Sequence, residues 1–140
     1  MFLFRSPTSR QLSIGLALLR IGVGAVFIDH GYQKLFGMGF AGVTGAFSHM
    51  GVPLPGIMGP FVALLEFFGG IALILGLLTR LVALGFAIDM LVAILLVQLK
   101  NGFSHYELEF LLCVASLALV FMGGGEFSVD ALLGRRKTNV

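Results

Sequence analysis

The sequence predicts an all-α integral membrane protein, a four-helix bundle formed by one domain over residues 1–140. Only 11% of the residues are charged and 58% are hydrophobic, and the mean hydropathy is +1.03. Because a soluble domain carries about a quarter charged residues, the solvent for most of this chain must be lipid. Four runs approach the ~20 residues that cross a bilayer. They are apolar on every side, which favours helices over barrel strands.

The four spans are expected at about 12–35, 60–78, 81–99 and 106–122. The first is apolar to residue 27 and continues as helix beyond it, and the fourth becomes apolar at residue 109. Pro60 suits the first turn of the second span, where an N–H is not needed. Gly76 and the Thr79-Arg80 pair mark a short connection, so the second and third spans should form a tight antiparallel hairpin.

The first outer loop, residues 37–59, is long enough to hold further structure. Phe40, Val43, Phe47 and Met50 recur at helical spacing before two prolines. This pattern predicts a short amphipathic helix at the outer interface. We expect it to be a packed cap over the bundle, and the alternative is a moving lid.

Orientation follows from the distribution of Lys and Arg, which are enriched in cytoplasmic loops. One side carries Arg5, Arg10, Arg80, Arg135, Arg136 and Lys137. The other side carries only Lys34 and Lys100. Both chain ends are therefore predicted to lie inside (N-in/C-in). Because Arg20 interrupts the first apolar run, this run is expected to be a retained helix and not a cleaved signal peptide.

Charged residues inside the spans are the informative ones, because a charge at mid-bilayer costs between ~2.5 and ~10 kcal/mol or more. The helical rise places Arg20 and Asp89 near the middle of the membrane and Glu66 in its outer half. A guanidinium stays protonated and can bind a carboxylate through two donors. Depth alone makes Asp89 the best partner of Arg20, although the side chain can also reach Glu66.

Two interpretations of these charges stay open. In the first, Arg20 and its acid form a buried ion pair that fixes helix register. In the second, Arg20, Glu66 and Glu109 bound a polar pocket, and His30 and Lys34 stand at its rim. Acids of shifted proton affinity beside a hydrogen-bond donor are what proton-coupled chemistry requires.

On the fourth span, Cys113 and Ser116 continue the small or polar stripe that begins at Glu109, and could complete the wall of that pocket. Cys113 is expected to be a packing residue and not a nucleophile. As the single cysteine of the chain, it cannot form an internal disulfide or a dithiol centre.

Seven segments along the chain resemble the DoxX family. They are Leu19–Gly22, Phe27–Gly37, Gly51–Pro53, Glu66–Gly70, Leu75–Arg80, Tyr106–Glu109 and Gly123–Asp130. The resemblance implies a four-helix protein of a bacterial or archaeal inner membrane. It also implies an association with quinone-linked sulfur oxidation, as in small subunits of thiosulfate:quinone oxidoreductases, or with thiol and oxidative-stress complexes.

The family pattern carries over to Arg20, His30, Lys34, Glu66 and Glu109, and it favours Glu66 as the partner of Arg20. Asp89 lies outside the pattern and depends on the physical argument alone.

The functional hypothesis is a membrane subunit of a quinone-linked or thiol/sulfur redox system. Arg20, Glu66 and Glu109 would form the pocket and handle protons. His30, Lys34 and Asp89 would contact a quinone head group or line the rim.

No metal, haem, flavin or nucleotide is expected. The three histidines lack ligand spacing, and Gly123–Gly125 lacks the strand that precedes a dinucleotide-binding turn. The chain is therefore at most a subunit of an oxidoreductase, and its electrons would come through a quinone or a partner's cofactor.

Two other classes of function remain: a small transporter for protons or a weak acid, and a non-catalytic anchor that recruits redox enzymes. Expected partners are membrane lipid, a redox-enzyme subunit and a second copy of the chain. A formal charge of +2 with no basic stripe excludes nucleic acid.

Overall fold

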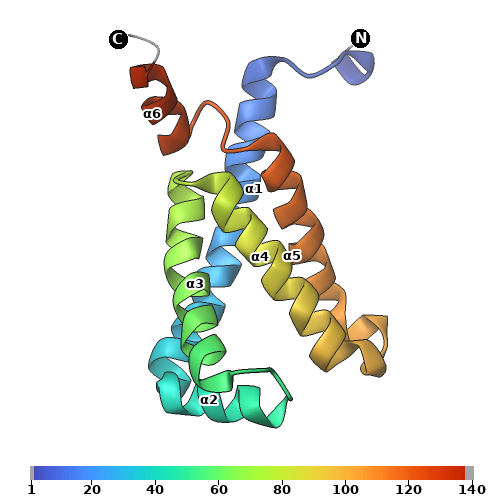
Figure 1. Ribbon diagram of the computed structural model, residues 1–140. Helices are drawn as coiled ribbons and strands as arrows, with labels where there is room; N and C mark the ends of the chain where they lie inside the picture. Colours follow the sequence, from blue (N-terminus) through green and yellow to red (C-terminus); the bar gives the residue numbers. More distant parts are fainter. Residues whose placement is uncertain (1, 138–140) are drawn as a thin grey trace.

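The computed structural model describes residues 2–137; residue 1 and residues 138–140 lie outside it. Within the described part the chain is all-α, and four helical segments are long and apolar enough to cross a membrane, as predicted. The long helices are α1 (Ser9–Tyr32), α3 (Pro55–Leu75), α4 (Thr79–Ala93) and α5 (Phe103–Met122) (Figure 1). The shorter ones are α2 (Gly39–His49) and α6 (Val129–Lys137). A π-helical segment, Gln33–Met38, follows α1, and a second, Ile94–Gln98, extends α4.

The two ends of the bundle differ in what they carry. The N-terminus of α1, the α3–α4 turn and α6 lie at one end, which we call the terminal face (Figure 1). The helix α2 crosses the opposite end, which we call the loop face. The short helix predicted between the first two spans is therefore confirmed. Its Val43 is only 1% exposed and packs beside Gly59 of α3, as expected for a cap.

Local hydrogen bonds place the start of α1 earlier than hydropathy does. The N–H of Thr8 donates to Oε1 of Gln11 at 2.8 Å, and Oγ1 of Thr8 accepts from the N–H of Gln11 at 3.2 Å. This reciprocal pair is a capping box, which satisfies two of the donors that every helix start leaves unpaired. The helix consequently begins at Ser9 and not at residue 12.

The second span begins at Pro55, so its predicted start at Pro60 is wrong. Pro55 occupies the first-turn position that suits proline, and Pro60 lies inside the helix. The span also ends at Leu75 and not at residue 78. These shifts place Glu66 near the middle of α3, at a depth similar to that of Asp89 in the third span.

The connection between α3 and α4 is as short as predicted, but the two helices do not stay together. Gly76 adopts a φ of +73° and donates to the carbonyl of Leu73 at 3.1 Å, while Leu77 donates to that of Ala72 at 2.8 Å. This pair of bonds is a Schellman motif. Beyond the turn α3 packs chiefly on α1, and α4 packs chiefly on α5. The two helices therefore separate toward the loop face (Figure 1).

Glycines allow α1 and α3 to approach closely, as small residues commonly do in membrane helices. A Cβ added to Gly24 would lie 2.7 Å from the carbonyl oxygen of Gly70, and one added to Gly31 would lie 2.7 Å from Cα of Phe67. The core beside this contact includes the stacked rings of Phe27 and Phe86, whose centroids are 3.7 Å apart.

The helix contact at Gly31 is testable with a matched pair of variants. Gly31→Ala should destabilise the protein by about 1–3 kcal/mol, because its methyl group overlaps the α3 backbone. Gly22→Ala is the control: its Cβ would meet nothing within 4 Å, so it should be neutral or slightly stabilising. Thermal unfolding in detergent measures both, and equal melting temperatures for the two variants would contradict the packing.

The orientation of the bundle remains a prediction of the Lys/Arg distribution. A fluorescent protein fused to the C-terminus should fluoresce in cells, since it folds in the cytoplasm, and alkaline phosphatase at the same site should be inactive. The opposite pair of results would reverse the predicted orientation.

Candidate functional site

Arg20 is buried at the terminal face and contacts carbonyl groups, not acids. Its exposed fraction is 1%. Nη1 donates to the carbonyl oxygens of Leu73 at 3.1 Å and Ile74 at 2.8 Å, and Nη2 donates to that of Phe127 at 2.7 Å. Among the described residues no carboxylate forms an ion pair with it. The prediction that Arg20 pairs with Glu66 or Asp89 in a shared pocket is therefore wrong.

The direction of side chains on a helix explains this result. The Cα–Cβ bonds of α1 tilt toward its N-terminus, so the long side chain of Arg20 extends toward the terminal face. There it meets the last turn of α3, whose final carbonyls lack helical partners and carry the negative end of the helix dipole. Three carbonyl groups thus bind the two Nη atoms, while Nε is buried without a hydrogen-bond partner in the described part of the chain.

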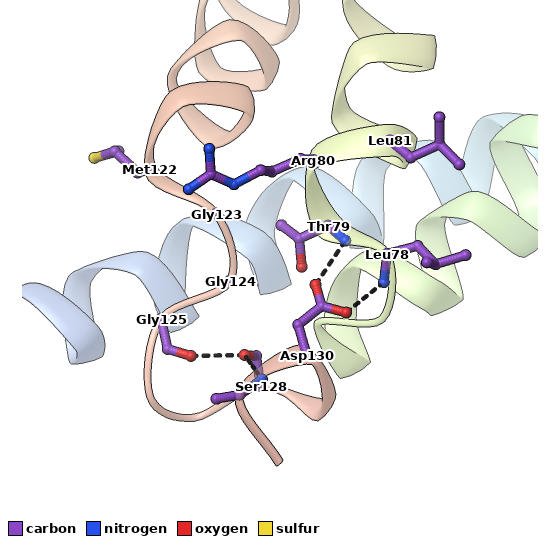
Figure 2. Close-up of a pocket in the computed structure, with 11 residues that line it drawn as sticks. Leu78, Thr79, Arg80, Leu81, Met122, Gly123, Gly124, Gly125, Ser128 and Asp130 are labelled. Carbon is purple, nitrogen blue, oxygen red and sulfur yellow. Dashed lines mark hydrogen bonds between the residues drawn. The ribbon is translucent and has the colours of Figure 1, made fainter. Parts of the chain in front are cut away.

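Asp130, which is not among the predicted site residues, binds the N–H groups at the start of α4, as Arg20 binds the carbonyl groups at the end of α3. Its carboxylate accepts from the N–H groups of Leu78 and Thr79, each at 2.8 Å, as Figure 2 shows. Its own N–H donates to the carbonyl of Gly76 at 3.0 Å. We call Arg20 and Asp130, together with the turn Gly76–Leu78 between them, the terminal clasp. Asp130 belongs to the DoxX-like segment Gly123–Asp130, but its role is not evident from the sequence, because its partners lie about fifty residues away along the chain.

The terminal clasp lowers the pKa of Asp130. Burial by itself would raise the pKa of Asp130, but hydrogen bonds from Thr79 and Leu78 and the charge of Arg20 outweigh it. The pKa therefore lies below its ordinary value of 3.8. An open hollow of about 570 Å³ lies beside this aspartate. Its polar groups include Asp130 and Ser128, which are already bonded within the chain (Figure 2).

A second cavity, of about 560 Å³, opens between α3 and α4, and we call it the α3–α4 cavity. Its wall is mostly apolar and comes largely from α3, α4 and the π-helical segment Ile94–Gln98 that extends α4. Five of the six predicted site residues line it, namely His30, Lys34, Glu66, Asp89 and Glu109. The structure thus brings together the predicted acids and rim residues and leaves out Arg20.

An ion pair marks the polar end of the α3–α4 cavity. Nζ of Lys34 lies 2.6 Å from Oε2 of Glu66, and the Glu66 side chain is 2% exposed. Asp89 lines the same cavity and lies close enough to Glu66 for the two carboxyl groups to interact electrostatically, and its Oδ2 is buried without a donor. We call these three residues the carboxyl cluster.

Helix geometry explains why these three side chains meet. Glu66 and Asp89 lie at similar depths in α3 and α4, and both line the cavity that opens between these helices. Lys34 is held by the π-helical segment Gln33–Met38, and Gln98 of the second π-helical segment also lines the cavity. Such segments often occur at functional sites.

The remainder of the predicted stripe on α5 does not reach the cavity. Sγ of Cys113 lies 3.5 Å from the carbonyl of Ala87, and Ser116 is fully buried. Only Glu109, near the start of α5, lines the α3–α4 cavity. Its neighbours on the stripe are packing residues in this arrangement.

The comparisons with known proteins agree with this fold. The DoxX family model matches residues 15–99. The chain belongs to the DoxX family. The matched range includes all three members of the carboxyl cluster as well as Arg20 and His30, and it ends before Glu109.

Three relatives match most of the DoxX chain. The Bacillus subtilis protein named "Putative oxidoreductase CatD" is 32% identical, with 94% of this chain and 96% of the relative covered. The Escherichia coli "Inner membrane protein YqjF" is 35% identical, with 88% and 95% covered. The Mycobacterium tuberculosis "Uncharacterized membrane protein Rv3486" is 30% identical, with 86% and 82% covered. No solved structure matches the chain.

The terminal clasp predicts a pH-dependent effect of Asp130→Asn. Because the folded pKa of Asp130 is lowered, its stabilisation is present above the ordinary value of 3.8 and is lost as the pH falls below it. At neutral pH the free energy of unfolding of the variant should be about 0.5–2 kcal/mol lower than that of wild type, as when other helix-capping residues are removed. Thermal unfolding at neutral and strongly acidic pH measures the difference.

Glu126→Gln, at an exposed carboxylate in the loop that precedes α6, is the control and should be neutral at both pH values. If Asp130→Asn loses as much stability in acid as at neutral pH, the stabilisation does not come from a charged carboxylate that caps α4.

Proposed function

We propose that this DoxX protein is a small membrane subunit of a quinone-linked or thiol/sulfur redox system in a bacterial cytoplasmic membrane. The α3–α4 cavity would hold a quinone head group, and the carboxyl cluster would exchange its protons. The observation that carries the proposal is the Lys34–Glu66 ion pair, which lies with the buried Asp89 in a mostly apolar cavity. The names of the Bacillus subtilis and Escherichia coli relatives support the redox role and the membrane, respectively.

The size and lining of the cavity fit such a ligand. Sites for small molecules usually measure 300–1,000 Å³ and combine apolar walls with a few converging polar groups. The α3–α4 cavity, at about 560 Å³, has this composition. The buried Oδ2 of Asp89 also lacks a donor, so an additional polar group at this position would remove an energetic cost.

A quinone would supply two-electron chemistry, and the chain would supply proton transfer. When protonated, the Glu66–Asp89 pair can donate a hydrogen bond to a carbonyl oxygen and deliver its proton there. Lys34 compensates the charge that remains on the carboxyl groups. Glu109 and His30 also line the cavity, and they would pass protons between the cluster and the membrane surface. Electrons would reach this site from a partner subunit.

A proton or weak-acid transporter could use the same carboxyl cluster. The packing in the described structure is less favourable to it, because the core between the cluster and the terminal face is filled. Phe27, Leu73 and Phe86 are all fully buried there. Transport would need a second state in which this core opens. An anchor with no chemistry would leave the buried carboxyl pair without a role.

Retention of quinone by the purified protein tests the proposal. Wild-type protein, extracted and analysed by mass spectrometry, should contain a quinone. Glu66→Gln and Asp89→Asn should each weaken its binding about tenfold to hundredfold, the effect of losing a hydrogen bond to a charged group. Glu107→Gln, at an exposed acid of α5, should bind as wild type does.

Three results would separate the alternatives. Proton flux in liposomes without quinone or partner would support transport. A stable partner that still copurifies with the Glu66→Gln, Asp89→Asn double variant, while no quinone is ever bound, would support an anchor. Full quinone retention by both single variants would show that the carboxyl cluster is not its site.

A further inference from the structure

We propose that the terminal face binds anionic phospholipid and that α6 is the main part of this lipid-binding surface. The apolar first half of α6 lies at the boundary of the hydrocarbon core, and its basic end binds the phosphate groups of lipid heads. This surface lies at the opposite end of the bundle from α2 (Figure 1) and is independent of the function proposed for the α3–α4 cavity.

Little of the protein itself supports α6 beyond its first turn. The helix has 9 residues, fewer than the ~12–15 that an isolated helix needs in water. Its start is fixed, because the N–H of Ala131 donates to Oγ of Ser128 at 3.2 Å and Asp130 binds the start of α4. In the described part of the chain, α6 makes no extensive contact with another helix, and it stands apart from the bundle in Figure 1. The rest of α6 therefore depends on a surface outside the chain.

The side chains exposed around this helix are apolar. Leu132 is 59% exposed and Leu133 is 48% exposed, and Phe127, in the loop before the helix, is 53% exposed. Leaving such side chains in water costs free energy. The boundary between lipid heads and acyl chains removes that cost, as it does for other helices at a membrane interface. These residues have access to that boundary because they follow directly on the end of a membrane-spanning helix.

The charge of the terminal face selects anionic lipid heads. Its cations come from both ends of the chain and from the start of α4: Arg5, Arg10, Arg80 and Arg135–Lys137. Its acids are Glu126 and Asp130, and the carboxylate of Asp130 is already bound to the start of α4. Each cation close to an anionic membrane surface strengthens binding about fivefold. Several cations on one face therefore retain lipids that carry a net negative charge.

The order of residues along α6 matches the layers of a membrane surface. The helix runs from the α3–α4 turn toward the C-terminus and away from the spans (Figure 1). At a rise of ~1.5 Å per residue, the run that begins at Arg135 lies about 3–8 Å beyond Leu132 and Leu133. The layer of lipid heads is about 5–8 Å thick on each side of the hydrocarbon core. The cations therefore reach lipid phosphates while the two leucines contact acyl chains.

A soluble protein with an acidic surface would also be attracted by these cations. Lipid fits better, because lipid phosphates already surround this end of the bundle in an anionic membrane. Acyl chains also provide an apolar partner for Leu132 and Leu133, which acidic groups on a soluble protein do not. We therefore assign the surface to the anionic lipids of the membrane that the four helices span.

The test is native mass spectrometry of the full chain in detergent, titrated with phosphatidylglycerol or with phosphatidylcholine of the same acyl chains. Wild type should bind the anionic lipid at least about tenfold more tightly than the neutral one. The triple variant Arg135→Gln, Arg136→Gln, Lys137→Gln should weaken binding of phosphatidylglycerol about tenfold to hundredfold. Its binding of phosphatidylcholine should change less than about twofold.

Matched variants separate charge, position and apolar contact. Arg135→Lys, Arg136→Lys keeps the cations and should bind both lipids as wild type does. Lys100→Gln removes an exposed cation at the other end of the bundle and should also have no effect. Leu132→Ser, Leu133→Ser keeps every charge and should weaken binding of phosphatidylglycerol about tenfold, since contact with acyl chains is lost. The melting temperature of each variant should equal that of wild type, because α6 makes no extensive contact with the described bundle.

Three results would overturn the proposal. The first is equal affinity of wild type for the two lipids. The second is an equal loss in the triple glutamine variant and in Lys100→Gln, which would place the bound lipid away from α6. The third is a triple variant that binds lipid normally but loses a soluble protein that copurifies with wild type, which would assign the surface to a protein partner. The quinone site is tested separately and is unaffected by any of these results.

Discussion

The bond between the guanidinium of Arg20 and the last carbonyls of α3 is the constraint on which the bundle depends. A buried cation in an apolar helix must be satisfied by polar groups, and few are available in a membrane. Helix C-termini supply them, because their final carbonyls have no partners within the helix. This requirement brings α1, the end of α3 and the carbonyl of Phe127 to one place. Asp130 completes the terminal clasp at the start of α4.

Fixing the helices at one face leaves them free to separate at the other. Arg20 binds one end of the α3–α4 turn and Asp130 binds the other. Beyond the turn, α3 packs chiefly on α1 and α4 packs chiefly on α5. The space that results is the α3–α4 cavity. Two groups of charged residues thus have different tasks: the terminal clasp sets the architecture, and the carboxyl cluster carries the chemistry that we propose. The stacked rings of Phe27 and Phe86 lie in the core between them.

The sequence identifies many of the residues in the candidate site, but it does not show which of them bind one another. Charged residues in apolar runs are rare, so the sequence alone marks Glu66 and Asp89, while the DoxX resemblance marks Lys34. The depth of Glu66 differs from the prediction, because the boundary of its helix differs. Once α3 begins at Pro55 and not at Pro60, Glu66 moves to the depth of Asp89. The partner of Arg20 was missed because backbone carbonyls, which every residue has, leave no signal in a sequence.

The sequence by itself determined the membrane class, the four spans, the capping helix after the first span and the set of residues able to carry chemistry. These follow from hydropathy and helical spacing, which are local properties of the chain. Only the tertiary structure decided that Lys34 and not Arg20 pairs with Glu66, and that Asp130 caps α4. Such choices depend on the rotation of each helix and the direction of each long side chain, which are set when the helices pack together.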